Sequence, residues 1–229
     1  MNVVKSLDFL RNYSLRKIKG RYGSSDDAGN RALLLSVQSD YNYDLHIPTG
    51  YNGTFTKPRV NSLREAIMIC YPYEKLEEFS GREYIANILL NRKIDPDYYV
   101  NLLKEYNYKW NDICVDEPLL YHLTHLIWGL YMIGDQNHIL RRYRPLMTDV
   151  LLKILDRVKE CLDIRTETLY FLTLINPRKV KEEWIIELEQ CQRPDGSYPA
   201  RDYIEEAHHT ALALLTLYNY YNTDLSKSY

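Results

Sequence analysis

The sequence has 229 residues, of which 45% are hydrophobic, and its formal net charge is −2. This length suits one domain with a sizeable core, and interspersed charges of both signs favour neither a nucleic-acid-binding surface nor a polybasic membrane patch. No apolar run approaches the length of a membrane span, and charges interrupt the apolar residues of the N-terminal segment, which argues against a signal peptide. We therefore expect a cytoplasmic protein.

The first 60 residues are predicted to be the least regular part of the chain. Apolar residues at helical spacing predict a helix over residues 3–18 and a shorter one over residues 31–37. Residues 40–58 are rich in turn-forming residues and predict a loop or a short hairpin. This loop is a candidate rim or lid of a site, with a plain connection as the alternative.

From residue 61 onward, helical periodicity holds almost to the end of the sequence. Helices are predicted over residues 61–70, 81–91, 95–106, 116–133, 145–159, 163–175, 184–192 and 209–218. The segment 145–159 is amphipathic, so one side can face water, whereas residues 209–218 are apolar almost all round and must be buried on every side. The two kinds of helix alternate along the chain.

The apolar helices recur at a constant period. THLIWGLYMI from Thr124, ETLYFLTLI from Glu167 and HTALALLTLY from His209 superpose with Leu126, Leu169 and Ala211 at equivalent places. A period of about 42–43 residues accommodates two helices and two turns. The pattern predicts an all-α fold of helical hairpins stacked in two layers. We expect a single domain over residues 1–229, with an irregular part over 1–60 and the hairpin repeats over 61–229.

One turn carries a resemblance to a known superfamily. Trp184 and the following Gln192-x-x-Asp195-Gly196-Ser197-Tyr198 resemble the QW-type repeat of the terpenoid cyclases and protein prenyltransferases, which form an α/α-toroid. The resemblance implies a small or partial toroid, since complete toroids use more hairpins than this chain supplies. Within the turn, Gln192 can tie the turn to the start of the next helix, and Asp195-Gly196 is typical of a tight turn with positive φ.

Polar residues gather at one level of the predicted hairpins. The period makes Thr124, Glu167 and His209 equivalent, near the starts of the inner helices. Helix capping explains the threonine and the glutamate, but several histidines at one level favour a functional cluster. The candidate catalytic residues are His209, His208, Glu167 and Glu206, and the candidate substrate-binding residues are Trp128, Tyr121, Tyr170 and Tyr198.

Zinc is the cofactor that the sequence suggests. His209-Thr210 resembles the His-Thr pair of the prenyltransferases, which supplies a zinc-ligating histidine, and Asp112-Ile113-Cys114 resembles their Asp-x-Cys ligand pair. The repeat register places Cys114 about ten residues too early for that role. The other candidate metal site is His122, His125 and His209, because residues i and i+3 share a helix face.

The resemblance implies a terpenoid cyclase- or prenyltransferase-like protein that holds an apolar, polyprenyl-like small molecule or a peptide between its inner helices. Its chemistry would be acid–base or metal-assisted. The Asp-x-Asp-Asp and Asp-Asp-x-x-Asp motifs of the cyclases do not occur in the sequence, so catalysis itself stays open. The alternative is a non-catalytic helical-repeat module with a concave surface for a partner.

Overall fold

The computed structural model describes residues 1–19, 25–47, 65–66, 96–111, 116–132, 136–158, 161–200 and 203–223. These residues form eight α-helices and one short 3₁₀ helix, and they contain no strand. The prediction of an all-α protein is confirmed. The predicted helix over 81–91, most of that over 61–70, most of the loop over 40–58 and the Asp-x-Cys pair lie outside the described residues.

The chain divides into two compact units. Unit 1 comprises Met1–Phe79 and Glu182–Tyr221, and unit 2 comprises Ser80–Lys181 with Asn222–Tyr229. A toroid would have to include hairpins of both units. The toroid and the single domain over residues 1–229 therefore stay predictions.

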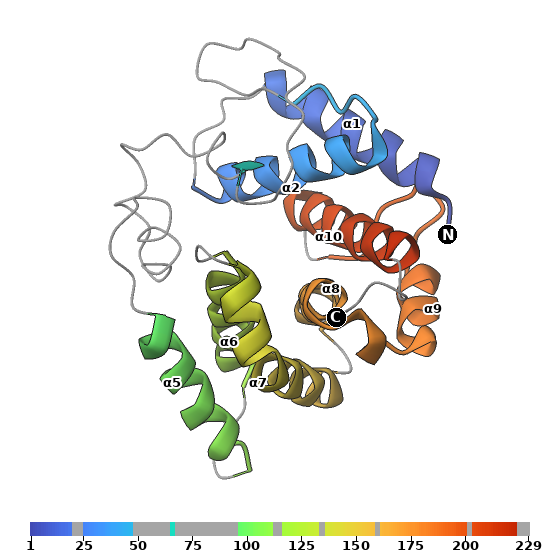
Figure 1. The fold of residues 1–229 in the computed structure, drawn as a ribbon. Helices are drawn as coiled ribbons and strands as arrows, with labels where there is room; N and C mark the ends of the chain where they lie inside the picture. Colours follow the sequence, from blue (N-terminus) through green and yellow to red (C-terminus); the bar gives the residue numbers. More distant parts are fainter. Residues whose placement is uncertain are drawn as a thin grey trace. The chain divides into compact units, whose positions relative to one another are not determined.

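Unit 2 contains four α-helices in consecutive contact (Figure 1). They are α5 (Pro96–Tyr108), α6 (Glu117–Met132), α7 (Gln136–Arg157) and α8 (Leu162–Ile175), followed by the 3₁₀ helix η2 (Pro177–Lys179). Besides its neighbour in the chain, α5 contacts α7, and α6 contacts α8. This is the contact pattern of two stacked hairpins, α5–α6 and α7–α8.

Two side-chain hydrogen bonds between these helices join residues one period apart, whereas Tyr143–Asp97 and Lys153–Asn107 join residues 46 apart. Thr124 on α6 bonds Glu167 on α8, and Asn107 on α5 bonds Asp149 on α7, at sequence separations of 43 and 42 residues. In both pairs a residue meets its counterpart in the next hairpin. Residues one period apart in the first interval of the predicted repeat are therefore in direct contact in unit 2.

Helix α7 begins earlier than predicted. The sequence predicted a start at Pro145, but the helix runs from Gln136 with Pro145 in its interior. A proline removes one helical hydrogen bond and normally ends or kinks a helix. Here both Pro145 and Arg141, four residues before it, are exposed, so water can reach the carbonyl group that lacks a helical partner.

Helix α8 is buried along almost its whole length, polar residues included. The buried threonine hydroxyls donate hydrogen bonds to carbonyl groups of the same helix. Thr166 donates to the Leu162 carbonyl at 2.7 Å, and Thr168 donates to the Ile164 carbonyl at 2.6 Å. Buried polar groups need such partners. The threonines predicted near the inner-helix starts are thus compatible with the core.

Unit 1 contains α1 (Val3–Lys19), α2 (Ser25–Tyr41), α9 (Glu182–Gln190) and α10 (Tyr203–Asn222). Helix α10 is buried continuously from Ala211 to Leu217, as its all-round apolar sequence predicts. Helix α9 buries only Ile185 and Leu188. The predicted contrast between an inner and an outer helix is confirmed for this pair.

The turn between α9 and α10 docks on the first turn of α1. The Gln192 amide accepts from the Asn2 backbone N–H at 2.7 Å and donates to the Asn2 carbonyl at 2.9 Å and to Ser6 Oγ at 2.7 Å. The prediction that Gln192 bonds backbone at a helix end is confirmed. The prediction that this helix would be the next one in the chain was wrong, because Gln192 binds the start of α1 and not α10. No local sequence pattern can reveal a contact between residues 190 positions apart.

Gly196 lies at the closest point of this contact. Its φ of +94° is the positive value that the Asp-Gly pair predicts. A Cβ atom at this position would lie 2.3 Å from the Lys5 carbonyl carbon, which is far inside van der Waals contact. Glycine is therefore required twice, by the backbone conformation and by the approach of α1.

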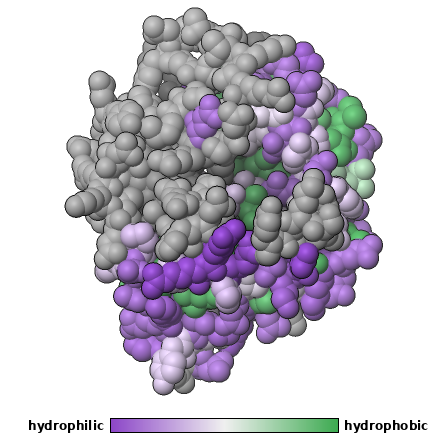
Figure 2. Space-filling model, viewed as in Figure 1, coloured by the Kyte–Doolittle hydropathy of each residue, from purple (hydrophilic) through white to green (hydrophobic). Residues whose placement is uncertain are grey.

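The exposed surface is mostly hydrophilic. Figure 2 shows hydrophilic residues over most of the described part of the face in view, with small separate hydrophobic places. The exposed large hydrophobic side chains include Tyr98 and Tyr108 on α5 and Ile186 on α9. Among the helices of the described ranges, none is long and apolar enough to cross a membrane.

Candidate functional site

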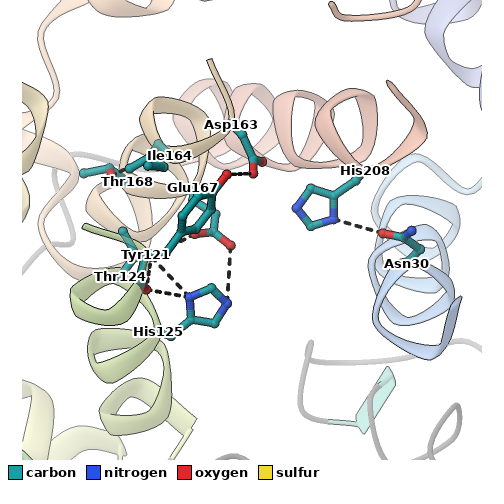
Figure 3. Close-up of polar contacts among 9 residues, drawn as sticks. All are labelled: Asn30, Tyr121, Thr124, His125, Asp163, Ile164, Glu167, Thr168 and His208. Carbon is teal, nitrogen blue, oxygen red and sulfur yellow. Dashed lines mark hydrogen bonds and ion pairs between the residues drawn. The ribbon is translucent and has the colours of Figure 1, made fainter. Parts of the chain in front are cut away.

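Several sequence-predicted residues of unit 2, among them Tyr121, His125 and Glu167, meet where α6 lies against α8 (Figure 3). Thr124 Oγ1 donates to Glu167 Oε2 at 2.8 Å, and His125 Nε2 lies 3.9 Å from Glu167 Oε1. Glu167 is only 6% exposed. A buried carboxylate needs such partners, because burial without them is costly for a charge. Glu167 and His125, chosen separately from the sequence, thus form one cluster.

The orientation of His125 follows from its own helix. Its Nδ1 lies 2.6 Å from the backbone carbonyl oxygen of Tyr121, one turn earlier on α6. A carbonyl oxygen only accepts, so Nδ1 carries the hydrogen and donates it. In the neutral ring Nε2 is then the basic atom, and it faces the Glu167 carboxylate. Fixing one ring nitrogen in this way sets the role of the other.

Tyr121 joins the two helices one turn closer to their starts. Its hydroxyl donates a short hydrogen bond to Asp163 Oδ2 on α8. Burial raises the pKa of Tyr121, and the negative charge of Asp163 raises it further. The phenol therefore keeps its proton and acts as a donor at neutral pH. Tyr121 was predicted to bind substrate, and the structure shows it holding Asp163 and orienting His125.

A row of aromatic rings runs through the same contact. The ring centroids are 6.3 Å apart for Tyr121 and His125, 5.8 Å for His125 and Trp128, and 6.3 Å for Trp128 and Phe171. Tyr170, the remaining substrate-binding candidate of this unit, continues the row at 5.3 Å from Phe171. Tyr121, His125 and Trp128 are half-buried, so solvent reaches one side of the row.

Trp128 has an unsatisfied donor. Its indole nitrogen is buried and makes no hydrogen bond to any residue that the structure describes. Such a group is destabilised relative to one that keeps a hydrogen bond with water.

The two histidines of the predicted zinc site contact different helices. His122 is exposed and its ring lies 5.9 Å from that of Tyr106 on α5, whereas His125 faces α8. Partial burial lowers the pKa of His122, and the nearby His125 lowers it further. The described ranges contain no group of three His, Cys, Asp or Glu side chains arranged to hold a metal ion. The set of His122, His125 and His209 spans both units and stays a prediction.

The other predicted residues belong to unit 1. His208 Nδ1 bonds Asn30 on α2 at 2.9 Å, His209 Nδ1 donates to the Pro199 carbonyl at 2.7 Å, and Glu206 pairs with Arg193. Figure 3 includes the His208–Asn30 bond. Tyr198 is fully buried, with its hydroxyl on Met1 Sδ and its backbone N–H on Thr210. Each of these residues ties α10 or its preceding turn to a neighbouring segment, and their catalytic and substrate-binding roles stay predictions.

Two members of the α6–α8 cluster were not predicted, namely Asp163 and Phe171. A signal for both was present in the sequence, because one period added to Tyr121 gives Asp163 and one added to Trp128 gives Phe171. Applying the period to every candidate residue would have found them. Asn30, which binds His208, lies in the part of the chain that the repeat fits loosely.

Comparisons with known proteins find no family, no curated protein and no solved structure that matches this chain.

Proposed function

We propose that unit 2 binds a small organic molecule with an apolar body where α6 meets α8. The observation that carries the proposal is the convergence of four sequence candidates, Tyr121, His125, Trp128 and Glu167, on one half-buried contact. Small-molecule sites typically combine aromatic walls with a few placed polar groups. The half-buried rings supply the wall, and the Glu167 and His125 side chains supply the polar groups.

The chemistry that this arrangement supports is proton transfer. A histidine whose Nδ1–H is held by a carbonyl oxygen presents Nε2 as a base, and a carboxylate beside it favours the protonated ring once a proton has been taken up. We therefore propose His125 as general base and Glu167 as the group that stabilises its protonated form. Thr124 holds Glu167, and Tyr121 holds His125.

Calorimetric titration with geraniol, a short polyprenyl alcohol, tests the binding site. Trp128→Ala should weaken binding at least about tenfold, since an aromatic side chain contributes a large part of the apolar area that a ligand can cover. The matched control is Tyr108→Ala, which removes an aromatic side chain that is 89% exposed on α5 of the same unit. Equal binding by both variants, or no binding by the wild type of geraniol or of any other small molecule with an apolar body, would contradict the proposal.

A second candidate function is a non-catalytic repeat module that binds a peptide. It is favoured by the stacking of α5 on α7 and of α6 on α8, since stacked hairpins commonly offer an extended binding surface. In that case a selected peptide should lose affinity when Tyr98 and Tyr108, both exposed on α5, are replaced by alanine. Trp128→Ala should then leave peptide binding intact.

A further inference from the structure

The α6–α8 contact combines aromatic rings with negative charge. Asp163 and Glu167 are four residues apart and so lie on the same face of α8, beside the row formed by Tyr121, His125 and Trp128. Arg165 lies between them in sequence and two residues from each, which places it on another side of the helix. The face of α8 that meets α6 therefore presents two carboxylates.

The charges of α6 and α8 also favour a positively charged ligand. Helix α6 contains no lysine or arginine, and the charged side chains of α8 at neutral pH are Asp163, Arg165 and Glu167. When the histidines are neutral, the two carboxylates of α8 therefore outnumber the one positive charge, that of Arg165, on the described side chains of this helix pair. A diphosphate or another anion would be repelled here, whereas a cation would be attracted.

The aromatic rings add a second attraction for a cation. The face of a tryptophan or tyrosine ring attracts a cation placed within about 6 Å, and sites for alkylated ammonium groups are typically built from several such rings. Tyr121 and Trp128 are half-buried, so a ligand group can reach them without unfolding the helix pair. Ring faces and carboxylates together fit a group that is both apolar and positively charged.

We infer that the ligand of this site carries an alkylammonium group, which lies against the Tyr121 and Trp128 rings in the field of Asp163 and Glu167. The inference rests on the proposed function and names the class of its ligand. Both carboxylates already accept hydrogen bonds from Tyr121 and Thr124 and act on the ligand through their charge. The methyl groups of the ammonium contact the accessible parts of the Tyr121 and Trp128 rings.

The test compares choline with 3,3-dimethylbutan-1-ol, in which an uncharged carbon atom replaces the nitrogen. At about pH 8, where an ordinary histidine is neutral, calorimetric titration should show choline binding about tenfold more tightly than the neutral alcohol. Equal or tighter binding of the alcohol would overturn the inference and leave the proposed function standing. If geraniol, choline and the alcohol all fail to bind, both fall; if only geraniol binds, the inference alone falls.

Variants test the role of the carboxylates separately. Glu167→Gln and Asp163→Asn should each reduce the preference for choline over the alcohol about three- to tenfold, because each removes one charge and keeps the shape of the side chain. The control is Asp156→Asn, which removes an exposed carboxylate from α7. An unchanged preference in both site variants, with helical circular dichroism retained, would overturn the inference.

Discussion

The turn of Gln192 to Tyr198 in unit 1 and the α6–α8 contact in unit 2 were both singled out by their sequences, yet they differ in what their polar groups do. In the turn, the Gln192 amide bonds the Asn2 backbone and Ser6 Oγ at the start of α1, and Ser6 Oγ in turn donates to the carbonyl of Gly196, which packs against that helix. In the α6–α8 contact, titratable side chains lie beside half-buried aromatic rings. The turn motif, which was recognised from its sequence, has a structural role: it holds α1 in place. The candidate site is instead formed by residues that the repeat relates to one another.

This difference has a physical reason. Turn residues such as Asp-Gly are selected by backbone geometry, so a turn motif reports primarily on local structure. A repeat instead reports which residues stack on which, and stacked positions can bring a base and an acid together.

Gly196→Ala should have the largest effect on unit 1. The added Cβ would lie 2.3 Å from the Lys5 carbonyl carbon at a φ of +94°, so strain and overlap combine. We expect a loss of about 3–5 kcal/mol in the free energy of unfolding. Urea unfolding followed by Trp184 fluorescence, with Trp110 and Trp128 replaced by phenylalanine, measures it. Lys5→Ala is the control: it leaves the overlapping backbone atoms of Lys5 and Ser6 in place and removes only an exposed hydrogen bond from Lys5 Nζ to the Pro194 carbonyl, so it should cost at most about 1 kcal/mol. Equal losses for the two variants would contradict the role assigned to Gly196.

Gln192→Ala should cost about 2 kcal/mol, because it removes three hydrogen bonds that hold α1. The control is Gln190→Ala, an exposed amide two residues earlier. Both are measured by the same fluorescence experiment. An unchanged unfolding midpoint for Gln192→Ala would show that the motif is only a surface turn.

Tyr121→Phe should destabilise unit 2 by about 1–2 kcal/mol, because Asp163 loses the hydroxyl that donates to it. Tyr108→Phe, which removes a hydroxyl from a side chain that is 89% exposed, should cost nothing measurable. Trp128 fluorescence in a variant with Trp110 and Trp184 replaced by phenylalanine reports on this unit. The opposite order of the two effects would contradict the role assigned to Tyr121.

Asp40, in the last turn of α2, should make unit 1 depend on pH. Burial raises its pKa from 3.8 to about 6, so between these values the folded state binds more protons than the unfolded state. The contribution of Asp40 to the free energy of unfolding is fully present below about pH 4 and is lost as pH rises through about 6. We expect a decline of about 1 kcal/mol after allowing for the solvent that reaches this group. Subtracting the pH profile of the free energy of unfolding of Asp40→Asn from that of the wild type isolates the contribution of Asp40. Identical profiles for the two proteins would contradict this prediction.

The sequence predicts regular structure well where periodicity is strong. The apolar helix of residues 209–218 and the interval from Thr124 to Glu167 both follow from the spacing of apolar residues. The start of α7 was missed because Pro145 signals a helix boundary locally, whereas exposure of this stretch allows the helix to continue. The binding of Gln192 to α1 was missed because it joins residues 190 positions apart.

The candidate site shows the same division. Glu167 and His125 were found as titratable residues at one predicted level, and the structure brings them within 3.9 Å. Asp163 was missed although the period points to it from Tyr121. The contacts of His208 and His209 in unit 1 could not be predicted, because Asn30 and Pro199 carry no pattern that pairs them with a histidine.

The hydrogen bonds between Gln192 and the Asn2 backbone also determine when α1 can dock during synthesis of the chain. Helix α1 leaves the ribosome before the turn that holds it, which follows 190 residues later, after the whole of α5 to α8. At about 5–20 residues per second, α1 waits roughly 10–40 s for its partner. Unit 2 draws its helices from one continuous stretch and can close without that delay, so newly made chains should acquire protease resistance in the α5–α8 region before α1 does.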